Sequence, residues 1–228
     1  MVLGRPTDRT IAASVLASAG TQVYLEYGTA PGLYPGVTAT ATAATAYPVV
    51  LELAGLAPNT RYYYRARFRG AAETTFRTEP ERSFQTARSP GSTFTFGVQG
   101  DSHPERERNM FHPQLYRQTL QAVAAAQPDF YVTSGDDFSV DTLQPPYTSS
   151  NVTGRYTLQL PYLDLLSRSS ALFLGTGNHE QTSLANYNRA PDANNSNMVP
   201  VWAQNARNLY YPSPAPNDPR TGNFYSGN

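Results

Sequence analysis

The sequence predicts a β sandwich over residues 1–90, followed by an α/β layered fold over residues 91–228. From Ile11 to about Ala87, apolar and polar residues alternate with a period of two and are interrupted by Gly, Pro and Asn. Beyond residue 92, short apolar runs alternate with helical patterns, which is the order of elements in a βαβ fold. A chain of 228 residues is long enough for two such domains.

Three strands of the first part place apolar residues on one face and polar residues on the other. We expect them at residues 23–27, 49–53 and 61–69. In the third strand, Tyr62, Tyr64, Ala66 and Phe68 alternate with a polar row that consists of Arg61, Tyr63, Arg65, Arg67 and Arg69. This row is either a site for a polyanion or a solvated face whose charges keep the sheet from pairing with neighbours, and we favour the second interpretation.

The second part is joined to the first by residues 88–92, which are turn-forming and predict a linker. The expected order is a buried strand at 93–98, a helix at 113–127, a strand at 130–133, a helix at 156–166 and a strand at 171–174. Pro113 begins the first helix, where we expect His112 to be a structural or capping residue. Tyr210, Tyr211 and the asparagine-rich run 194–197 predict a long surface loop.

Charge and composition exclude several classes of function. The 17 basic residues, all arginine, balance 17 acidic residues, so nucleic acid is not expected as the primary ligand. Because cysteine is absent, a disulfide framework, a thiol nucleophile and a thiolate metal site are excluded. No apolar stretch approaches the roughly 18 residues of a membrane span, and the first residues lack the pattern of a signal peptide.

Polar clusters follow each of the three expected strands of the second part. In chain order they are Gly100-Asp101-Ser102-His103, Gly135-Asp136-Asp137-Phe138 and Gly177-Asn178-His179-Glu180. Because the carboxyl ends of strands in an open α/β sheet converge on one crevice, we expect the clusters to form one site. Their hard oxygen and imidazole donors suit Zn, Mn or Fe better than a structural zinc.

The first part resembles the fibronectin type III-like domain, an Ig-like sandwich, that precedes the catalytic domain in purple acid phosphatases. The resemblance covers roughly residues 9–88 and rests on segments 25–29 and 82–87 and on Leu56-Ala57-Pro58-Asn59-Thr60-Arg61-Tyr62. The last of these segments looks like a tyrosine corner. It implies that the Tyr62 hydroxyl bonds the backbone a few residues upstream.

The three polar clusters, in this order after successive strands, resemble the signature of calcineurin-like metallophosphoesterases. The resemblance implies a site for two divalent or trivalent ions of Fe, Zn or Mn, which supply a bound hydroxide for phosphoester hydrolysis. It places Asp101 and His103 on one metal, Asp136 as the bridge, and Asn178 on the second metal. Each residue alone also has a structural interpretation, as a helix cap, a core histidine or a turn residue.

His179 is implied to face the substrate, where it would protonate the leaving alcohol or stabilise the transition state. Asp137 or Glu180 is a candidate for orienting its ring, and both are equally open to interpretation as surface acids. Two positions depart from the purple acid phosphatase pattern. Ser139 replaces a tyrosine ligand, so no tyrosinate–iron charge transfer is expected, and His103 replaces a glycine.

The family also has further histidines after its Gly-Asn-His-Glu motif, whereas histidine occurs here only at 103, 112 and 179. We therefore expect the chain to be the front part of a longer protein, with an incomplete catalytic domain that holds at most one metal weakly and self-associates. Residues 222–228 look like the approach to another strand. The fragment should hydrolyse p-nitrophenyl phosphate poorly.

The whole protein is expected to hydrolyse phosphate monoesters. The alternatives are a phosphodiesterase of the same fold and a non-catalytic module for binding or adhesion. The family resemblance favours a secreted or periplasmic location, and the sequence itself leaves the compartment open.

Overall fold

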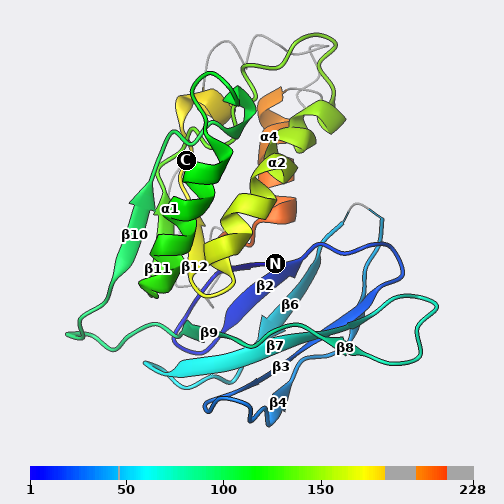
Figure 1. Cartoon of the computed structure of the whole chain (residues 1–228), viewed down its shortest axis with the longest axis vertical. Coiled ribbons are helices and arrows are strands. Elements are labelled where there is room, and N and C mark those ends of the chain that lie inside the picture. The colour runs from blue at the N-terminus through cyan, green and yellow to red at the C-terminus, as the bar shows by residue number, and fades with distance from the viewer. Residues whose placement is uncertain (46, 183–198, 215–228) are drawn as a thin grey trace, which may run out of the picture.

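The computed structural model describes residues 1–45, 47–182 and 199–214, and these form mixed sheets and helices (Figure 1). Two antiparallel sheets are built from residues 1–87, which we call the antiparallel region. One sheet contains β1 (Val2–Gly4), β2 (Ile11–Val15) and β6 (Val49–Leu53) in that order. The other contains β3 (Gln22–Gly28), β4 (Gly36–Val37), β5 (Ala41–Thr42), β7 (Arg61–Arg69), β8 (Arg77–Thr78) and β9 (Arg82–Gln85).

The alternation predicted for the antiparallel region is present in β3, β6 and β7. In β6 the buried residues are Val49, Leu51 and Leu53, and in β7 they are Tyr62, Tyr64 and Ala66. One hydrophobic cluster draws residues from both sheets, so the apolar faces of the sheets are turned toward each other. The hydroxyl of Tyr62 accepts a hydrogen bond from Ala57 N at 2.9 Å, which confirms the predicted upstream backbone contact.

The arginines of the polar row of β7 have hydrogen-bond partners within their own sheet. Arg65 and Arg67 both donate to the carboxylate of Glu26 in β3, at 2.7 and 3.2 Å. Arg65 also lies over the ring of Tyr34, 4.4 Å from its centroid. Arg69 donates to the side chain of Gln22 at 2.7 Å. These contacts favour the interpretation of the row as a solvated, internally paired face.

A parallel sheet and its helices are built from residues 93–182 and 199–214, which we call the parallel region. The sheet has the order β10 (Phe96–Gln99), β11 (Phe130–Thr133) and β12 (Ala171–Leu174). Its helices are α1 (Pro113–Ala125), α2 (Ser149–Ser167) and α4 (Val199–Tyr210), with the short turns η1 (Pro104–Arg106) and η2 (Asn178–Thr182). One cluster joins Leu120, Tyr131, Leu163, Leu172 and Ala203, so helices and sheet share a core. Among the residues described, no helix is long and apolar enough to cross a membrane.

The helix boundaries are partly as predicted. At the start of α1, the ring Nδ1 of His112 accepts from Leu115 N at 3.3 Å, so His112 is a capping residue. Helix α2 begins seven residues before the predicted position 156, because Thr148 caps it by accepting from Asn151 N at 3.1 Å. Apart from the buried Val152, residues 149–155 are polar or glycine, so the apolar periodicity does not reveal this part of the helix.

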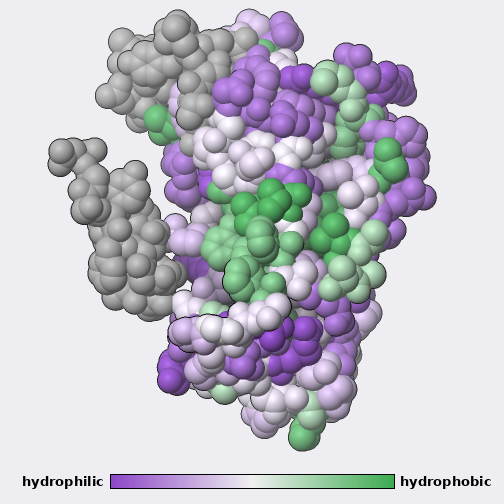
Figure 2. Space-filling model, turned by 90° about the vertical axis from the view of Figure 1, so that its left-hand side faces the viewer, coloured by the Kyte–Doolittle hydropathy of each residue, from purple (hydrophilic) through white to green (hydrophobic). Residues whose placement is uncertain are grey.

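The prediction of a buried strand at 93–98 was wrong. The strand begins at Phe96, and Phe94, Phe96 and Val98 are exposed at 53%, 51% and 60%. Helices cover the face of the sheet that carries Gly97, Tyr131 and Leu172, and the register places the phenylalanines and valines on the opposite face. We call this opposite face the outer face, which consists of Phe96, Val98, Phe130, Val132 and Phe173. Figure 2 views the molecule from the β10 side and shows hydrophobic residues gathered there.

The prediction of a surface loop at Tyr210 and Tyr211 was also wrong. Tyr210 ends α4 and is 4% exposed, while Tyr211 is 1% exposed and donates to Tyr156 O at 2.8 Å. The spacing of Val199, Ala203, Ala206 and Tyr210 places one face of α4 in the core. The run 194–197 and the expected strand approach at 222–228 lie outside the described residues.

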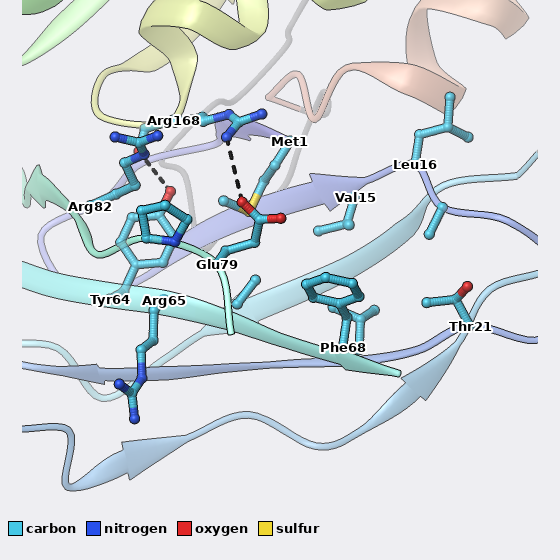
Figure 3. A pocket seen from close by; sticks show the side chains of 14 residues that line it. Met1, Val15, Leu16, Thr21, Tyr64, Arg65, Phe68, Glu79, Arg82 and Arg168 are labelled. Carbon is cyan, nitrogen blue, oxygen red and sulfur yellow. Dashed lines mark hydrogen bonds and ion pairs between the residues drawn. The ribbon is translucent and has the colours of Figure 1, made fainter. Parts of the chain in front are cut away.

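The two regions are in direct contact at several points. Strand β1 lies against β12 and α2, and the Ser14 hydroxyl of β2 donates to Tyr210 O at 3.0 Å. The Tyr64 hydroxyl donates to Arg168 O at 2.6 Å, beside a cavity of about 250 Å³ that Phe68 and Glu79 also line (Figure 3). The division into domains at residue 90 stays a prediction.

Candidate metal centre

The candidate site lies at the edge of the parallel sheet where β10, β11 and β12 all end. The loops after β11 and β12 are in close contact there. A Cβ at Gly135, whose φ is +109°, would lie 2.2 Å from Gly177 N, and a Cβ at Gly177 would lie 2.1 Å from Asp136 Oδ1. Only glycine fits at these two positions, so their lack of a side chain brings the polar clusters together.

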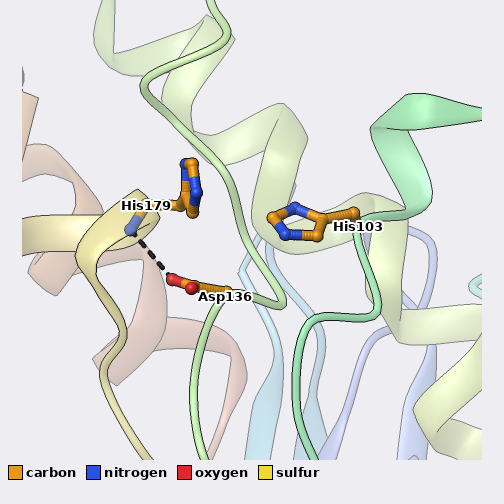
Figure 4. Close-up of side chains that lie close together, drawn as sticks. All are labelled: His103, Asp136 and His179. Atoms are coloured by element: carbon orange, nitrogen blue, oxygen red, sulfur yellow. Dashed lines mark hydrogen bonds between the residues drawn. The ribbon is translucent and has the colours of Figure 1, made fainter. Parts of the chain in front are cut away.

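His103, Asp136 and His179 converge at this edge (Figure 4). Each offers one potential ligand atom, and these atoms lie within 4.8 Å of one another. The two imidazole rings are 5.1 Å apart and nearly perpendicular, at 86°. His179 N donates to Asp136 Oδ1 at 2.9 Å, which fixes the carboxylate against the loop after β12. One carboxylate and two imidazoles form a donor set that suits Zn, Mn or Fe.

Backbone strain is found at three predicted site residues. Asp101, His103 and Asp136 have φ values of +54°, +44° and +60°, in the left-handed region that side-chain-bearing residues rarely adopt. Each such residue costs about 1–3 kcal/mol, and strain of this kind is concentrated at functional sites. The strained positions follow the ends of β10 and β11, where the chain turns sharply to present these side chains.

Of the four predicted metal ligands, two belong to the cluster and two lie outside it. His103 and Asp136 belong to the cluster. Asp101 lies beside it, with Oδ1 at 3.6 Å from His103 Nε2, and the Asp101 side chain is 75% exposed. Asn178 is exposed at the start of η2. His179, which was predicted to face the substrate, occupies the third corner of the cluster. The assignment of individual residues to metals stays a prediction.

The carboxylate of Glu180 holds the loops after β11 and β12 together. Its Oε1 accepts from Asp137 N at 2.6 Å and from Phe138 N at 3.0 Å, and its Oε2 accepts from Gly177 N at 2.7 Å. Glu180 is 2% exposed, so it is not a surface acid. Glu180 therefore stabilises the site by bonding the backbone of the two loops, without facing the metal-ligand cluster itself.

Asp137 is fully buried beneath the site. Its Oδ1 accepts from Ser102 Oγ at 2.6 Å and from Gln99 Nε2 at 2.9 Å. Burial raises the pKa of Asp137 to about 6, and the hydrogen bond from Ser102 opposes that shift. Gln159 of α2 donates to Ser102 Oγ at 2.5 Å and to Asp137 O at 2.8 Å. The network ties the loops after β10 and β11 to the helix.

The sequence interpretation did not identify Gln99, Ser102 or Gln159. Gln159 carries a usable signal, because it lies on the buried face of α2 with Val152, Tyr156, Leu163 and Leu166. A polar residue in such a position needs a buried hydrogen-bond partner. Ser102 carries no such signal, since the middle position of the Asp-x-His motif is unrestricted.

Both histidine rings are held through Nδ1. His179 Nδ1 is 2.6 Å from Asp141 Oδ2, so the orienting contact comes from Asp141, a residue that the sequence interpretation passed over in favour of Asp137 and Glu180. His103 Nδ1 is 2.7 Å from Ser139 Oγ and 3.3 Å from Glu105 Oε1. Engagement of Nδ1 leaves Nε2 of each ring for a ligand or substrate.

His103 and Ser139 are the two positions at which the sequence departs from the purple acid phosphatase pattern, and they contact each other directly. The two departures are therefore not independent. Ser139 supplies a hydrogen-bond partner for the buried ring of His103, which is 4% exposed.

No family model matches the chain, and no curated protein matches it. Among solved structures, the chain is similar to PhoD, with a TM-score of 0.59 and 16% identity over 93% of this chain and 45% of that one. It is also similar to purple acid phosphatase PPD1 from yellow lupin (Lupinus luteus) seeds, with a TM-score of 0.63 and 15% identity over 99% and 42%. The chain spans less than half the length of either structure. At these identities, the likeness shows a phosphoesterase-like fold.

Proposed function

We propose that this chain belongs to a metal-dependent phosphoesterase that hydrolyses phosphate monoesters. The observation that carries the proposal is the convergence of His103, Asp136 and His179 at the carboxyl edge of a parallel sheet. The fold similarity to PhoD and to a purple acid phosphatase supports it. In this proposal, residues 1–90 are a fibronectin type III-like sandwich and residues 91–228 are the first part of a metallophosphoesterase domain.

The residues divide the work between holding metal and acting on substrate. Asp101, His103, Asp136 and Asn178 would hold one or two ions of Zn, Mn or Fe. Bound metal would neutralise charge that develops on the phosphate oxygens and lower the pKa of a water molecule. With Ser139 in contact with His103, no tyrosinate ligand is expected at this position.

His179 would donate a proton to the leaving alcohol or stabilise charge in the transition state. Asp141 holds the Nδ1 side of the ring, so Nε2 is the atom that meets the substrate. The contact between His179 N and Asp136 Oδ1 keeps the acid next to the proposed bridging carboxylate. Position and orientation are thus both set by the loops of the parallel sheet.

Metal reconstitution tests the proposal. Metal-free protein would be loaded with Zn²⁺ or Mn²⁺ and assayed with p-nitrophenyl phosphate, a monoester, and bis-p-nitrophenyl phosphate, a diester. We expect metal to stimulate hydrolysis of the monoester more than that of the diester. Because the described donors are few, the chain should hold one ion more readily than two, and its turnover should be slow.

Matched carboxylate variants complete the test. Asp136→Asn keeps the shape of the side chain and removes its charge, so it should abolish the metal-stimulated rate. Asp8→Asn, at a position 52% exposed in the antiparallel region, should leave that rate unchanged. Metal binding without hydrolysis of either ester would favour the non-catalytic module, and faster turnover of the diester would favour the phosphodiesterase.

A further inference from the structure

Arg155 of α2 reaches the loop that follows β11. Its Nη2 donates to Thr142 Oγ1 at 3.1 Å, and Thr142 Oγ1 donates to Ser139 O at 3.0 Å. Its Nε is buried and has no hydrogen-bond partner among the residues described. A guanidinium held inside a protein in this way needs nearby negative charge to offset the loss of water.

Two carboxylates supply that charge. The side chain of Glu105, on η1 beside α2, is only 2% exposed, and its Oε2 is buried without a partner in the described part of the chain. Asp141 immediately precedes Thr142, the residue that Arg155 contacts. Burial lowers the pKa of Arg155, and the charges of Glu105 and Asp141 oppose that shift. Arg106 also donates to Glu105 Oε1, at 3.2 Å.

The same two carboxylates each contact one histidine of the site. Glu105 Oε1 is 3.3 Å from His103 Nδ1, and Asp141 Oδ2 is 2.6 Å from His179 Nδ1. Because a carboxylate oxygen accepts hydrogen bonds, these contacts favour the tautomer with hydrogen on Nδ1 in each ring. Both rings then present Nε2 to the space between them.

We propose that Arg155 is a positioning residue: its bond to Thr142 anchors the loop that carries Ser139 and Asp141, and its charge offsets those of Glu105 and Asp141. The contacts of Ser139 with His103 and of Asp141 with His179 then fix both rings with Nε2 facing the site. One arginine on a helix thereby sets the orientation of two rings that come from different loops. The inference rests on the proposed function only in taking this space as a metal site.

Zinc affinity provides the first readout. Arg155→Met should weaken Zn²⁺ binding by about 10–100-fold, the usual effect of losing a residue that supports a metal ligand. Arg155→Lys keeps the charge and should recover most of the affinity. Arg117→Met is the matched control, because Arg117 is an exposed helical arginine that lies over the Tyr162 ring. Isothermal titration calorimetry measures all four proteins, and circular dichroism verifies their folding.

Histidine tautomers provide a second readout that needs neither metal nor activity. The chain contains only three histidines, so ¹⁵N imidazole spectra are simple to assign. His103 and His179 should be Nδ1–H tautomers, whereas His112 accepts at Nδ1 and should be the Nε2–H tautomer. In Arg155→Met, the first two should become tautomer mixtures, while His112 stays unchanged.

Unchanged tautomers and unchanged Zn²⁺ affinity in a folded Arg155→Met protein would overturn the inference. A rise in KM for p-nitrophenyl phosphate with neither change would also overturn it, since Arg155 would then contact substrate. If Arg155→Met fails to fold, Arg155→Gln replaces it, because glutamine can still donate to Thr142. A wild-type protein that binds zinc but hydrolyses nothing would contradict the proposed function and leave this inference standing.

Discussion

The antiparallel and parallel regions bury different kinds of side chain. In the antiparallel region, the buried residues are apolar apart from Ser14, Gln85 and Thr86, and the arginine row is paired on the surface. In the parallel region, Asp137 and Glu180 are buried beneath the strand ends, while Phe96 and Val98 of the sheet are exposed. Burying a carboxylate lowers the stability of a fold. The buried acids of the parallel region therefore hold the site loops in place at a cost in stability that the antiparallel region does not have.

The largest expected effect tests the site itself. In a catalytically active form, His179→Ala should lower kcat by about 10²–10⁴-fold, the range for a positioned acid, and leave metal content near that of the wild type. Steady-state kinetics and elemental analysis measure the two quantities. Loss of metal together with activity would make His179 a ligand, as its place in the cluster also permits.

The next largest effect concerns the free energy that burial of the Asp137 carboxyl costs the folded protein. The pKa of Asp137 is raised from 3.8 to about 6, so the folded state binds the proton more tightly than the unfolded state. Its contribution to the free energy of unfolding is therefore greatest below pH 4 and falls by about 3 kcal/mol in total as the pH rises through and above 6. In Asp137→Asn this fall should be absent.

Urea unfolding of the metal-free proteins between pH 4 and 7 measures the difference. Asp8→Asn serves as the control from the antiparallel region, because Asp8 is exposed. If the curves for wild type and Asp137→Asn run parallel over this range, burial of Asp137 carries no such cost.

A smaller effect is expected in the antiparallel region. Tyr62→Phe removes the acceptor for Ala57 N and should reduce the free energy of unfolding by about 1–2 kcal/mol. The ring keeps its stacking on Phe84, at 5.7 Å between centroids. Tyr63→Phe, at the adjacent position on the other face of β7, should change stability by less than about 0.5 kcal/mol. Equal effects of the two substitutions would show that the hydroxyl contact contributes nothing.

The smallest change in stability is expected when one exposed valine in each region is replaced by lysine. Val98 on the outer face is 60% exposed and Val50 in β6 is 48% exposed. Replacing either valine by lysine should change the free energy of unfolding by less than about 1 kcal/mol. Only Val98→Lys should reduce self-association, because Val98 is part of a continuous apolar surface. Sedimentation velocity over a concentration series decides this, and identical behaviour of wild type and Val98→Lys would count against the outer face as the contact surface.

Sequence periodicity predicted β3, β6 and β7 of the antiparallel region, because each has one face that is more buried than the other. It did not predict β1 and β2, whose residues are buried on both faces. It placed β11 and β12 correctly, and the strand-end rule predicted that His103 and Asp136 would lie together. It could not predict that β10 is exposed, since an apolar run looks the same whether one or both faces of the sheet are covered. It also missed Asp141, because only the folded loop brings that carboxylate to His179.

The contacts between the regions have a consequence for a nicked chain. The linker at 88–92 is exposed at most of its positions and is open to cleavage by a protease. The pieces would not simply diffuse apart, because β1 lies against β12, and Ser14 and Tyr64 bond backbone across the junction. A cleaved sample should therefore elute as one species under native conditions and as two in denaturant. The two regions are thus held together by the contacts between them as well as by the covalent linker.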